Sequence, residues 1–160
     1  MCAIFGAIDF EKELLESNMF DNVRLMKHRG PDNSGSWISD NRKVFLGFNR
    51  LAIIDLSEEA NQPFVSESKK HVLIFNGEIY NFKYIRKKLV SLGHKFRTSS
   101  DSEVLLKAYI QWDTDCLEML EGMFSFAIYD LSKDIIFLAR DRSGEKPLYY
   151  FTNKKKLVFL

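Results

Sequence analysis

The second residue of the chain is a cysteine, and its position gives it chemistry that an internal cysteine lacks. An initiator methionine followed by a small side chain is normally removed, so loss of Met1 would leave Cys2 with a free α-amine. That amine has a reference pKa of roughly 7.7–8.0, against about 8.5 for the thiol, so one residue would carry both a nucleophile and a base. The alternative interpretation is a small residue packed in a strand, because cysteine is among the most buried types.

Four further residues could serve acyl-transfer chemistry. Asn76 and Gly77 follow an apolar run, where a side-chain amide and a backbone N–H could point at one developing oxyanion. Asn-Gly is also the commonest tight hairpin turn. Arg50 could hold a carboxylate in a two-pronged contact, or it could be solvated at a sheet edge. Asp101 lies in the first turn of a predicted helix, where the alternative is that it only favours the helix dipole.

Length and composition describe the scaffold that must position these residues. The chain has 160 residues, of which 46% are hydrophobic and 28% charged, as expected for one ordinary globular domain. Phe alone accounts for 14 residues, which predicts a well-filled core because each buried ring removes about 150–250 Å² from water. The net charge of +1 provides no basic field for nucleic acid or for an anionic membrane.

Several other classes are excluded by local features of the sequence. No apolar stretch approaches the roughly 20 residues of a transmembrane helix, and Asp9 and Glu11 arrive too early for a signal peptide. The two cysteines, Cys2 and Cys116, do not form a disulfide framework, so a reducing compartment is the simpler setting. The three histidines are scattered without ligand-like spacing. We therefore expect a cytoplasmic protein with no nucleic-acid or membrane partner and no metal.

The hydrophobic pattern predicts strands separated by a few helices. Apolar runs predict strands at residues 2–8, 44–48, 51–54, 71–75, 123–129, 135–139, 148–151 and 157–160. Helical patterns lie at residues 14–26 (with a break at 17–18), 81–92, 101–108 and 116–120, and residues 28–35 are predicted to be a loop.

Capping signals and linker lengths refine these predictions. Asn81 is an expected N-cap, Gly93 an expected C′ residue, and Ser100-x-x-Glu103 an expected capping box. The last four strands are joined by short turns, which predicts an antiparallel meander. Lys154 belongs to a lysine run expected to be a solvated hairpin turn. Together these features predict an α+β fold, with two antiparallel sheets or one large sheet covered by helices.

Eight sequence blocks carry a resemblance to a known family. The blocks are MCAIFG at residues 1–6, KHRGPD at 27–32, NRLAIID at 49–55, NQPF at 61–64, FNGEIYNF at 75–82, SSDSEV at 99–104, GMFSFAIYD at 122–130 and ARDRSGEKPLYY at 139–150. With these blocks the chain resembles the class II glutamine amidotransferase domain, an N-terminal-nucleophile hydrolase. It looks most like the glutaminase domain of glutamine-dependent asparagine synthetases. The resemblance implies one glutaminase domain over residues 1–160, folded as a four-layer α/β/β/α sandwich with two antiparallel sheets.

The resemblance also implies a role for each matching residue. Cys2 would attack the side-chain amide carbon of glutamine and form a thioester, with its own α-amine as the base. The implied roles of the others are: an oxyanion hole for Asn76 and Gly77, α-carboxylate binding for Arg50, α-ammonium binding for Glu78 and Asp101, and pocket lining for Ile53 and Ile54.

Two residues depart from the family pattern. The family usually has glycine after the cysteine, and this chain has Ala3, whose methyl group could crowd the substrate or shift the nucleophile. This motivates an alternative in which the chain is a catalytically impaired glutamine-binding or regulatory module. Ser143 replaces a usually bulkier apolar residue, and we interpret it as a surface change.

The resemblance implies a partner as well. Asparagine synthetases continue into an ATP-dependent domain that this sequence, which ends at Leu160, does not include. No glycine-rich phosphate loop is present in it, so we expect no cofactor here, with ATP and Mg²⁺ needed only by the synthetase domain. Expected partners are glutamine, a synthetase domain in cis or in trans, and a second copy in a homodimer. The ammonia acceptor is aspartate by default, with a sugar acid as the other option.

Overall fold

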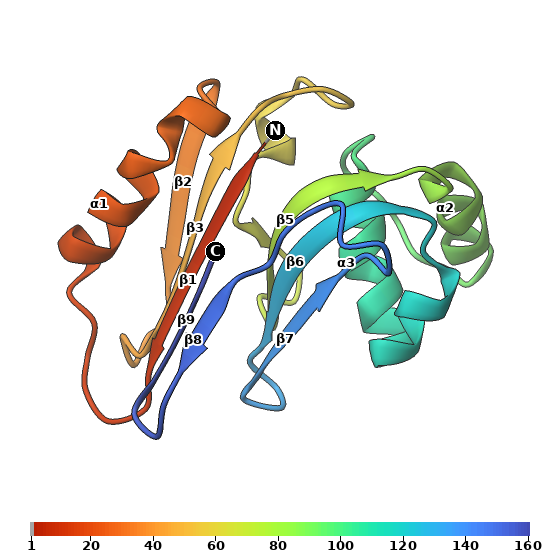
Figure 1. Ribbon diagram of the computed structural model, residues 1–160. Helices are drawn as coiled ribbons and strands as arrows, with labels where there is room; N and C mark the ends of the chain where they lie inside the picture. Colours follow the sequence, from red (N-terminus) through yellow and green to blue (C-terminus); the bar gives the residue numbers. More distant parts are fainter. Residues whose placement is uncertain (1) are drawn as a thin grey trace.

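Two antiparallel β-sheets lie face to face in the computed structural model, which describes residues 2–160 (Figure 1). The first sheet has five strands in the order β2-β3-β1-β9-β8. Their bounds are Asn33–Ile38 for β2, Val44–Arg50 for β3, Ala3–Asp9 for β1, Lys156–Phe159 for β9 and Tyr150–Thr152 for β8. The strand nearest the N-terminus is thus central in this sheet, paired with β3 on one side and β9 on the other.

The second sheet has four strands in the order β4-β5-β6-β7. Their bounds are Phe64–Val65 for β4, His71–Ile79 for β5, Gly122–Asp130 for β6 and Ile135–Arg140 for β7. The long pair β5 and β6 forms its centre, in register from His71 opposite Asp130 to Ile79 opposite Gly122.

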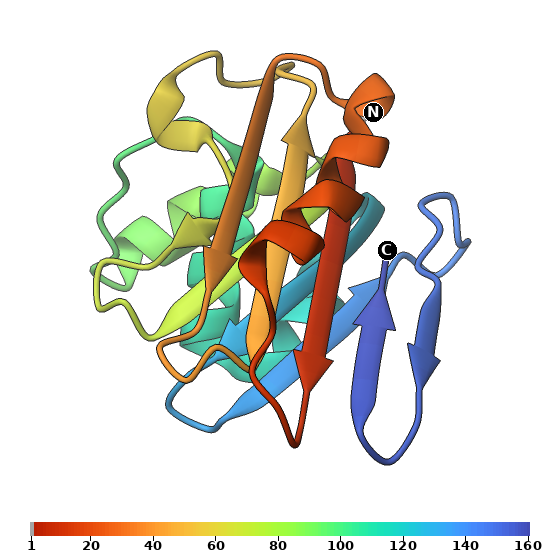
Figure 2. The same cartoon turned by 90° about the vertical axis from the view of Figure 1, so that its left-hand side faces the viewer.

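Helices cover the outer faces of both sheets. Helix α1 (Glu16–Leu25) lies across the five-stranded sheet, in front of it in Figure 2. Helices α2 (Phe82–Ser91) and α3 (Asp101–Trp112) cover the four-stranded sheet on the opposite side of the molecule (Figure 1). Three short 3₁₀ segments complete the fold, at Lys27–Arg29, Glu58–Ala60 and Asp113–Met119. The predicted α+β class with two antiparallel sheets is therefore confirmed.

The layering explains why β1 contains no polar–apolar alternation. Ile4 and Ile8 belong to the core between the two sheets, together with Ile74 of β5. Phe5 and Ala7 belong to the core beneath α1. Because both faces of the strand are covered, both faces must be apolar.

The ends of helix α3 and helix α2 follow local sequence signals. The Ser100 hydroxyl accepts a hydrogen bond from the Glu103 N–H at 3.3 Å, as the capping box predicts. The Glu103 carboxylate instead receives the N–H groups of Arg97 and Thr98. Gly93, just after α2, has a φ of +94° and is the predicted left-handed C′ residue. Asn81 is at the predicted N-cap position of α2, but its side chain does not cap the helix. It donates instead to Met119 O at 2.9 Å.

Four strand and loop predictions are wrong, each for a physical reason. Residues 51–54 form an irregular segment and not a strand, because Arg50 hydrogen-bonds the main chain that follows it. The predicted loop at 28–35 ends early, since β2 begins at Asn33 and pairs with β3. Strand β5 continues through Asn76 to Ile79 and does not turn. The last four strands divide between the sheets, because the segment 141–149 crosses from β7 to β8.

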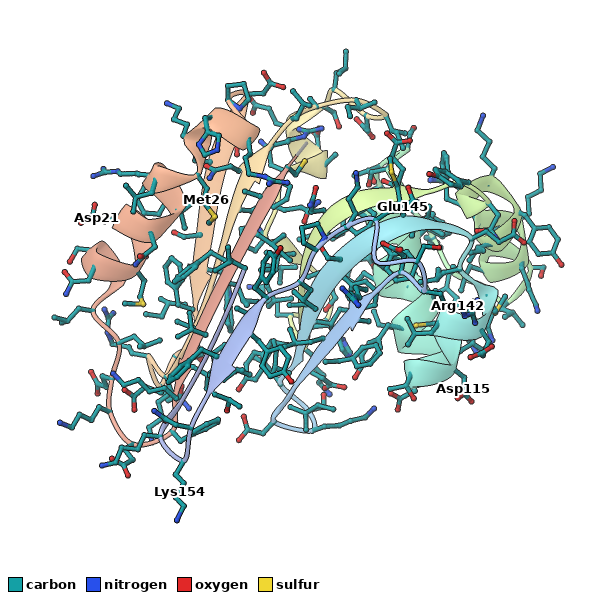
Figure 3. The ribbon with its side chains drawn as sticks, in the orientation of Figure 1. Asp21, Met26, Asp115, Arg142, Glu145 and Lys154 are labelled. Carbon is teal, nitrogen blue, oxygen red and sulfur yellow. The ribbon has the colours of Figure 1, made fainter. Side chains whose placement is uncertain are left out.

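The helix predictions need smaller corrections. The first helix is continuous from Glu16, without the break predicted at residues 17–18. The helix predicted at 116–120 is a 3₁₀ segment that already begins at Asp113. The lysine run lies at the β8–β9 hairpin, where Lys154 extends away from the molecule (Figure 3). In the part of the chain that the structure describes, no helix is long and apolar enough to cross a bilayer.

Candidate active site

One cleft brings together every residue that the sequence predicts to act in chemistry or binding. Its cavity has a volume of about 90 Å³ and is open to solvent. The eight predicted residues among its lining are Cys2, Arg50, Ile53, Ile54, Asn76, Gly77, Glu78 and Asp101. They come from the start of β1, the end of β3 and the segment after it, the end of β5 and the first turn of α3. The start of β1 lies near the top of Figure 1, and the segment that follows β3 passes close to it.

Cys2 lies directly before β1, and its sulfur is held by the main chain of the residue that follows β3. The Leu51 N–H donates to Cys2 Sγ at 3.3 Å, and the thiol can donate to Leu51 O at 3.6 Å. Arg29 Nε donates to the Cys2 carbonyl at 3.3 Å and fixes the backbone. Burial raises the pKa of the Cys2 thiol, while the Leu51 N–H and Arg50 oppose that rise. The thiol therefore needs a nearby base to become a nucleophile.

Gly77 presents its backbone N–H on the cleft side of β5. Opposite it in β6 is Phe124, whose N–H and C=O both bond to Asp141, at 3.1 and 2.8 Å. The N–H and C=O groups of Phe124 therefore point away from β5, toward Asp141. In an antiparallel pair the opposite residue does the same, so Gly77 directs its N–H away from β6. The position requires glycine, since a Cβ there would lie 2.2 Å from Met123 O.

Neighbouring residues on the same edge of β5 have their N–H groups satisfied. The side chain of Gln62 accepts from the Phe75 N–H at 2.6 Å and donates to its carbonyl at 3.3 Å. Asp101 Oδ2 accepts from the Ile79 N–H at 3.0 Å. These two partners flank Gly77 and leave its N–H available to the cleft. Asn76 is 4% exposed, and its side-chain amide makes no hydrogen bond to the rest of residues 2–160.

Arg50 is buried at the end of β3 with part of its guanidinium engaged. Nη1 donates to Ser57 O at 2.8 Å and to Asn61 Oδ1 at 2.6 Å, and Nη2 donates to Asp55 O. An arginine has five N–H donors, so Nε–H and one Nη2–H remain. The alternative of an arginine solvated at a sheet edge is wrong, since Arg50 is 8% exposed.

Two carboxylates face the cleft from the other side. Asp101 is buried in the first turn of α3, and burial raises its pKa to about 6, against the opposing effect of backbone N–H donors such as that of Ile79. Glu78 is half-buried on β5 and adds to that rise through its negative charge. A cation entering between the two carboxylates would favour the charged form of Asp101.

Ile53 and Ile54 lie on the irregular segment after β3 and not on a strand. Both are exposed, at 59% and 39% of their surface. They supply an apolar wall to the cleft without belonging to any of the three hydrophobic cores.

Ala3 does not narrow the cleft. It lies in extended strand, paired opposite Asn49, and is absent from the residues with positive φ. It lines a second, smaller cavity, which Cys2 and Asn76 also line, together with Met26 and Tyr149. The backbone conformation at this position therefore does not require glycine.

Sequence reasoning missed several residues that line the cleft or hold its lining residues in place. Arg29, Asp55, Asn61 and Gln62 all lie in the motif blocks, and their membership of those blocks was the available signal. Lys146 is buried and lines the cleft from the segment between β7 and β8. Lys146 also belongs to a motif block, that at residues 139–150, but only the crossing from β7 to β8 brings it to the same cleft as Cys2.

Comparison with known proteins identifies the class of fold. The chain superposes on glutamine phosphoribosylpyrophosphate amidotransferase from Bacillus subtilis with a TM-score of 0.82 and 22% sequence identity, covering 99% of this chain and 41% of that one. The two-sheet architecture is thus shared with that amidotransferase.

Sequence comparison is more specific. The glutamine amidotransferase domain model matches residues 1–160. The chain is 40% identical to asparagine synthetase [glutamine-hydrolyzing] 3 of Bacillus subtilis over 99% of its length and 26% of that protein. It is 42% identical to asparagine synthetase B of Escherichia coli, over 93% of this chain and 26% of that protein. The chain belongs to the glutamine amidotransferase domain family, and it spans about a quarter of the length of these two relatives.

Proposed function

We propose that this domain hydrolyses the side-chain amide of L-glutamine to glutamate and ammonia through a thioester on Cys2. The observation that carries the proposal is the composition of one cleft. It combines a cysteine sulfur, two N–H donors with no partner among residues 2–160, a buried arginine and two carboxylates. An α-amino acid with a side-chain amide matches these groups, because its carboxylate can meet the arginine and its ammonium can meet the two carboxylates.

The two ends of glutamine are assigned by charge. Its α-carboxylate binds the Nε–H and the remaining Nη2–H of Arg50, a charge-assisted contact. Its α-ammonium binds between Glu78 and Asp101. Holding both ends directs the amide toward Cys2 Sγ, and such positioning can lower a barrier by several kcal/mol.

Apart from the oxyanion donors, the proposed hydrolysis needs only the thiol and α-amine of Cys2 and one water molecule. The thiol proton passes to the α-amine, the sulfur attacks the amide carbon, and the oxyanion accepts hydrogen bonds from Asn76 Nδ2 and the Gly77 N–H. The α-ammonium of Cys2 then returns the proton to the amide nitrogen of the substrate, which departs as NH₃ and leaves a thioester. Water attacks the thioester to release glutamate and restore the thiol. These reaction steps need a free α-amine on Cys2 and hence loss of Met1, which lies outside the described residues.

The ammonia is proposed to pass to a synthetase domain, in cis or in trans. This proposal rests on the names of the relatives, which are asparagine synthetases of about four times the matched length. Aspartate is then the acceptor by default. ATP and Mg²⁺ would be bound by that synthetase domain and not by the residues described here.

Glutamate release by the purified protein tests the proposal. Protein that lacks Met1 is compared with its Cys2→Ala variant at equal concentration and saturating glutamine. We expect glutamate and ammonia in equal amounts from the first protein and background rates from the second. Equal rates from both would exclude Cys2 as the nucleophile.

A further inference from the structure

Asp55 links the two sides of the cleft. Its Oδ2 accepts a hydrogen bond from the Ser99 N–H at 2.7 Å, and its Oδ1 accepts one from the Ser57 N–H at 2.8 Å. Its main-chain carbonyl accepts from Arg50 Nη2. Ser99 lies just before the start of α3, two residues from Asp101. One residue thus contacts both the arginine side and the carboxylate side of the cleft.

The segment that carries Asp55 has little apolar packing to hold it in place. Ile53 and Ile54 are largely exposed, and residues 51–57 form no helix or strand. In Figure 1 the segment arcs from the end of β3 toward the half of the molecule that carries α2 and α3. Its conformation therefore depends on polar contacts. At its start these are the contacts of Leu51 with Cys2 and of Ala52 with Asp32; at its far end they are those of Arg50 with Ser57 and those of Asp55.

The Asp55 carboxylate is already engaged on both oxygens. Hydrogen bonds from Ser57, and further from the Ser99 N–H, hold the pKa of Asp55 below its ordinary value. The group stays ionised, and its bond to Ser99 is charge-assisted. Asp55 lines the cleft, and because each of its carboxylate oxygens holds a main-chain N–H, it supports the segments on both sides.

We propose that Asp55 is a positioning residue for the substrate, a clasp that holds the segment 51–57 against the start of α3. Closed in this way, the clasp sets the separation between Arg50 and Asp101 to match the two charged ends of one amino acid. The inference deepens the proposed function and rests on it. If the proposal holds, Asp55 determines how much affinity is gained when both charged ends of the substrate bind at the same time.

The test compares Asp55→Ala and Asp55→Asn with wild type in the full chain. Two substrates are used, L-glutamine and glutaric acid monoamide, which lacks the α-ammonium group. We expect Asp55→Ala to raise the KM for glutamine about tenfold, a change of roughly 1.4 kcal/mol, with kcat within about threefold. The KM for the monoamide should change little, since that compound engages only the arginine side. Asp55→Asn keeps one acceptor oxygen and should show a smaller rise.

Glu59→Gln is the matched control, because it removes an exposed carboxylate from the neighbouring 3₁₀ turn. It should leave both KM values unchanged. Alkylation of Cys2 by iodoacetamide, which needs no recognition of charged ends, should proceed in all variants at the wild-type rate.

Three results would overturn the clasp. An unchanged KM for glutamine in both Asp55 variants would do so. So would an equal rise for glutamine and the monoamide, or an alkylation rate that falls in parallel, because either result indicates a general structural role. If Asp55→Ala does not fold, Asp55→Asn decides. A wild-type protein that releases no glutamate at all contradicts the proposed function itself, and the clasp fails with it.

Discussion

The carboxylate of Asp101 accepts a hydrogen bond from the Ile79 N–H at 3.0 Å, and this contact joins helix α3 to the edge of β5 two residues beyond Gly77. The same carboxylate is buried next to the cleft, and its pKa is raised to about 6. Asp101 therefore has two consequences that can be measured separately, one for stability and one for substrate binding.

Asp101→Asn is predicted to gain stability relative to wild type as the pH rises. In the unfolded chain the carboxyl ionises near 3.8, whereas in the folded protein it holds its proton to about 6. Ionisation thus disfavours the folded state increasingly between pH 4 and pH 6, by on the order of 3 kcal/mol at most. Urea unfolding at pH 4 and pH 8 measures this difference. A constant difference between variant and wild type would contradict the raised pKa.

The same carboxyl predicts how glutamine affinity depends on pH. The α-ammonium binds the ionised form, so the KM of wild type should rise as the pH falls below about 6. Asp101→Asn should have a high KM that shows no such rise. Steady-state hydrolysis at pH 5 to 8 checks both, and a pH-independent KM in wild type would remove Asp101 from ammonium binding.

Asn76→Ala is predicted to lose activity without losing stability. Removing one oxyanion donor typically lowers kcat by about 10²–10³. The melting temperature should barely change, because the Asn76 side chain makes no hydrogen bond to the rest of residues 2–160. Asn76→Asp has the same shape without the donor when ionised and should be equally inactive. Near-normal kcat in both variants would assign oxyanion binding to other groups.

Ala3→Gly is predicted to be neutral for activity. Ala3 lies in extended strand and lines the smaller cavity, not the substrate cleft. The change should lower the free energy of unfolding by roughly 0.5–1 kcal/mol, through the greater backbone entropy of glycine. Kinetic constants should remain within about threefold of wild type, a difference below 1 kcal/mol. A large gain in kcat would show that the alanine impairs catalysis.

His71 predicts an acid sensitivity unrelated to the cleft. Burial lowers its pKa below 6.5, and Asp130, with an oxygen 3.6 Å from Nε2, opposes this only in part. Nδ1 is buried and has no hydrogen-bond partner among residues 2–160. The unfolded chain therefore binds this proton more readily, so stability is full above pH 6.5 and is lost as the pH falls below it. His71→Phe should lose less stability than wild type between pH 7 and pH 5 in chemical unfolding experiments.

Much of the site could be predicted because its residues lie in contiguous blocks. Cys2, Arg50, Asn76 and Asp101 were each recognisable by type and context, and the structure brings them to one cleft. Alternative interpretations of the same residues could not be separated by sequence alone. Asn76-Gly77 has the composition of a hairpin turn, yet β5 continues through it, because glycine there permits close approach to Met123.

The errors arose where distant residues override local pattern. The apolar run 51–54 has the composition of a strand, but Arg50 hydrogen-bonds the carbonyls that follow it and bends the chain over the cleft. Strand β2 begins in a segment rich in turn residues, since Asn33 and its neighbours find partners in β3. The division of the last four strands depends on β1, which lies between β3 and β9 and pairs with both.

The most direct test of the account is the intact mass of the protein after reaction with an electrophilic analogue of glutamine. We predict protein that lacks Met1, one adduct per chain mapped to Cys2, and protection from labelling by excess glutamine. An unlabelled protein, or labelling of Cys2 in chains that retain Met1 at the same rate as in chains that lack it, would contradict the claim that Cys2 and its own α-amine act together.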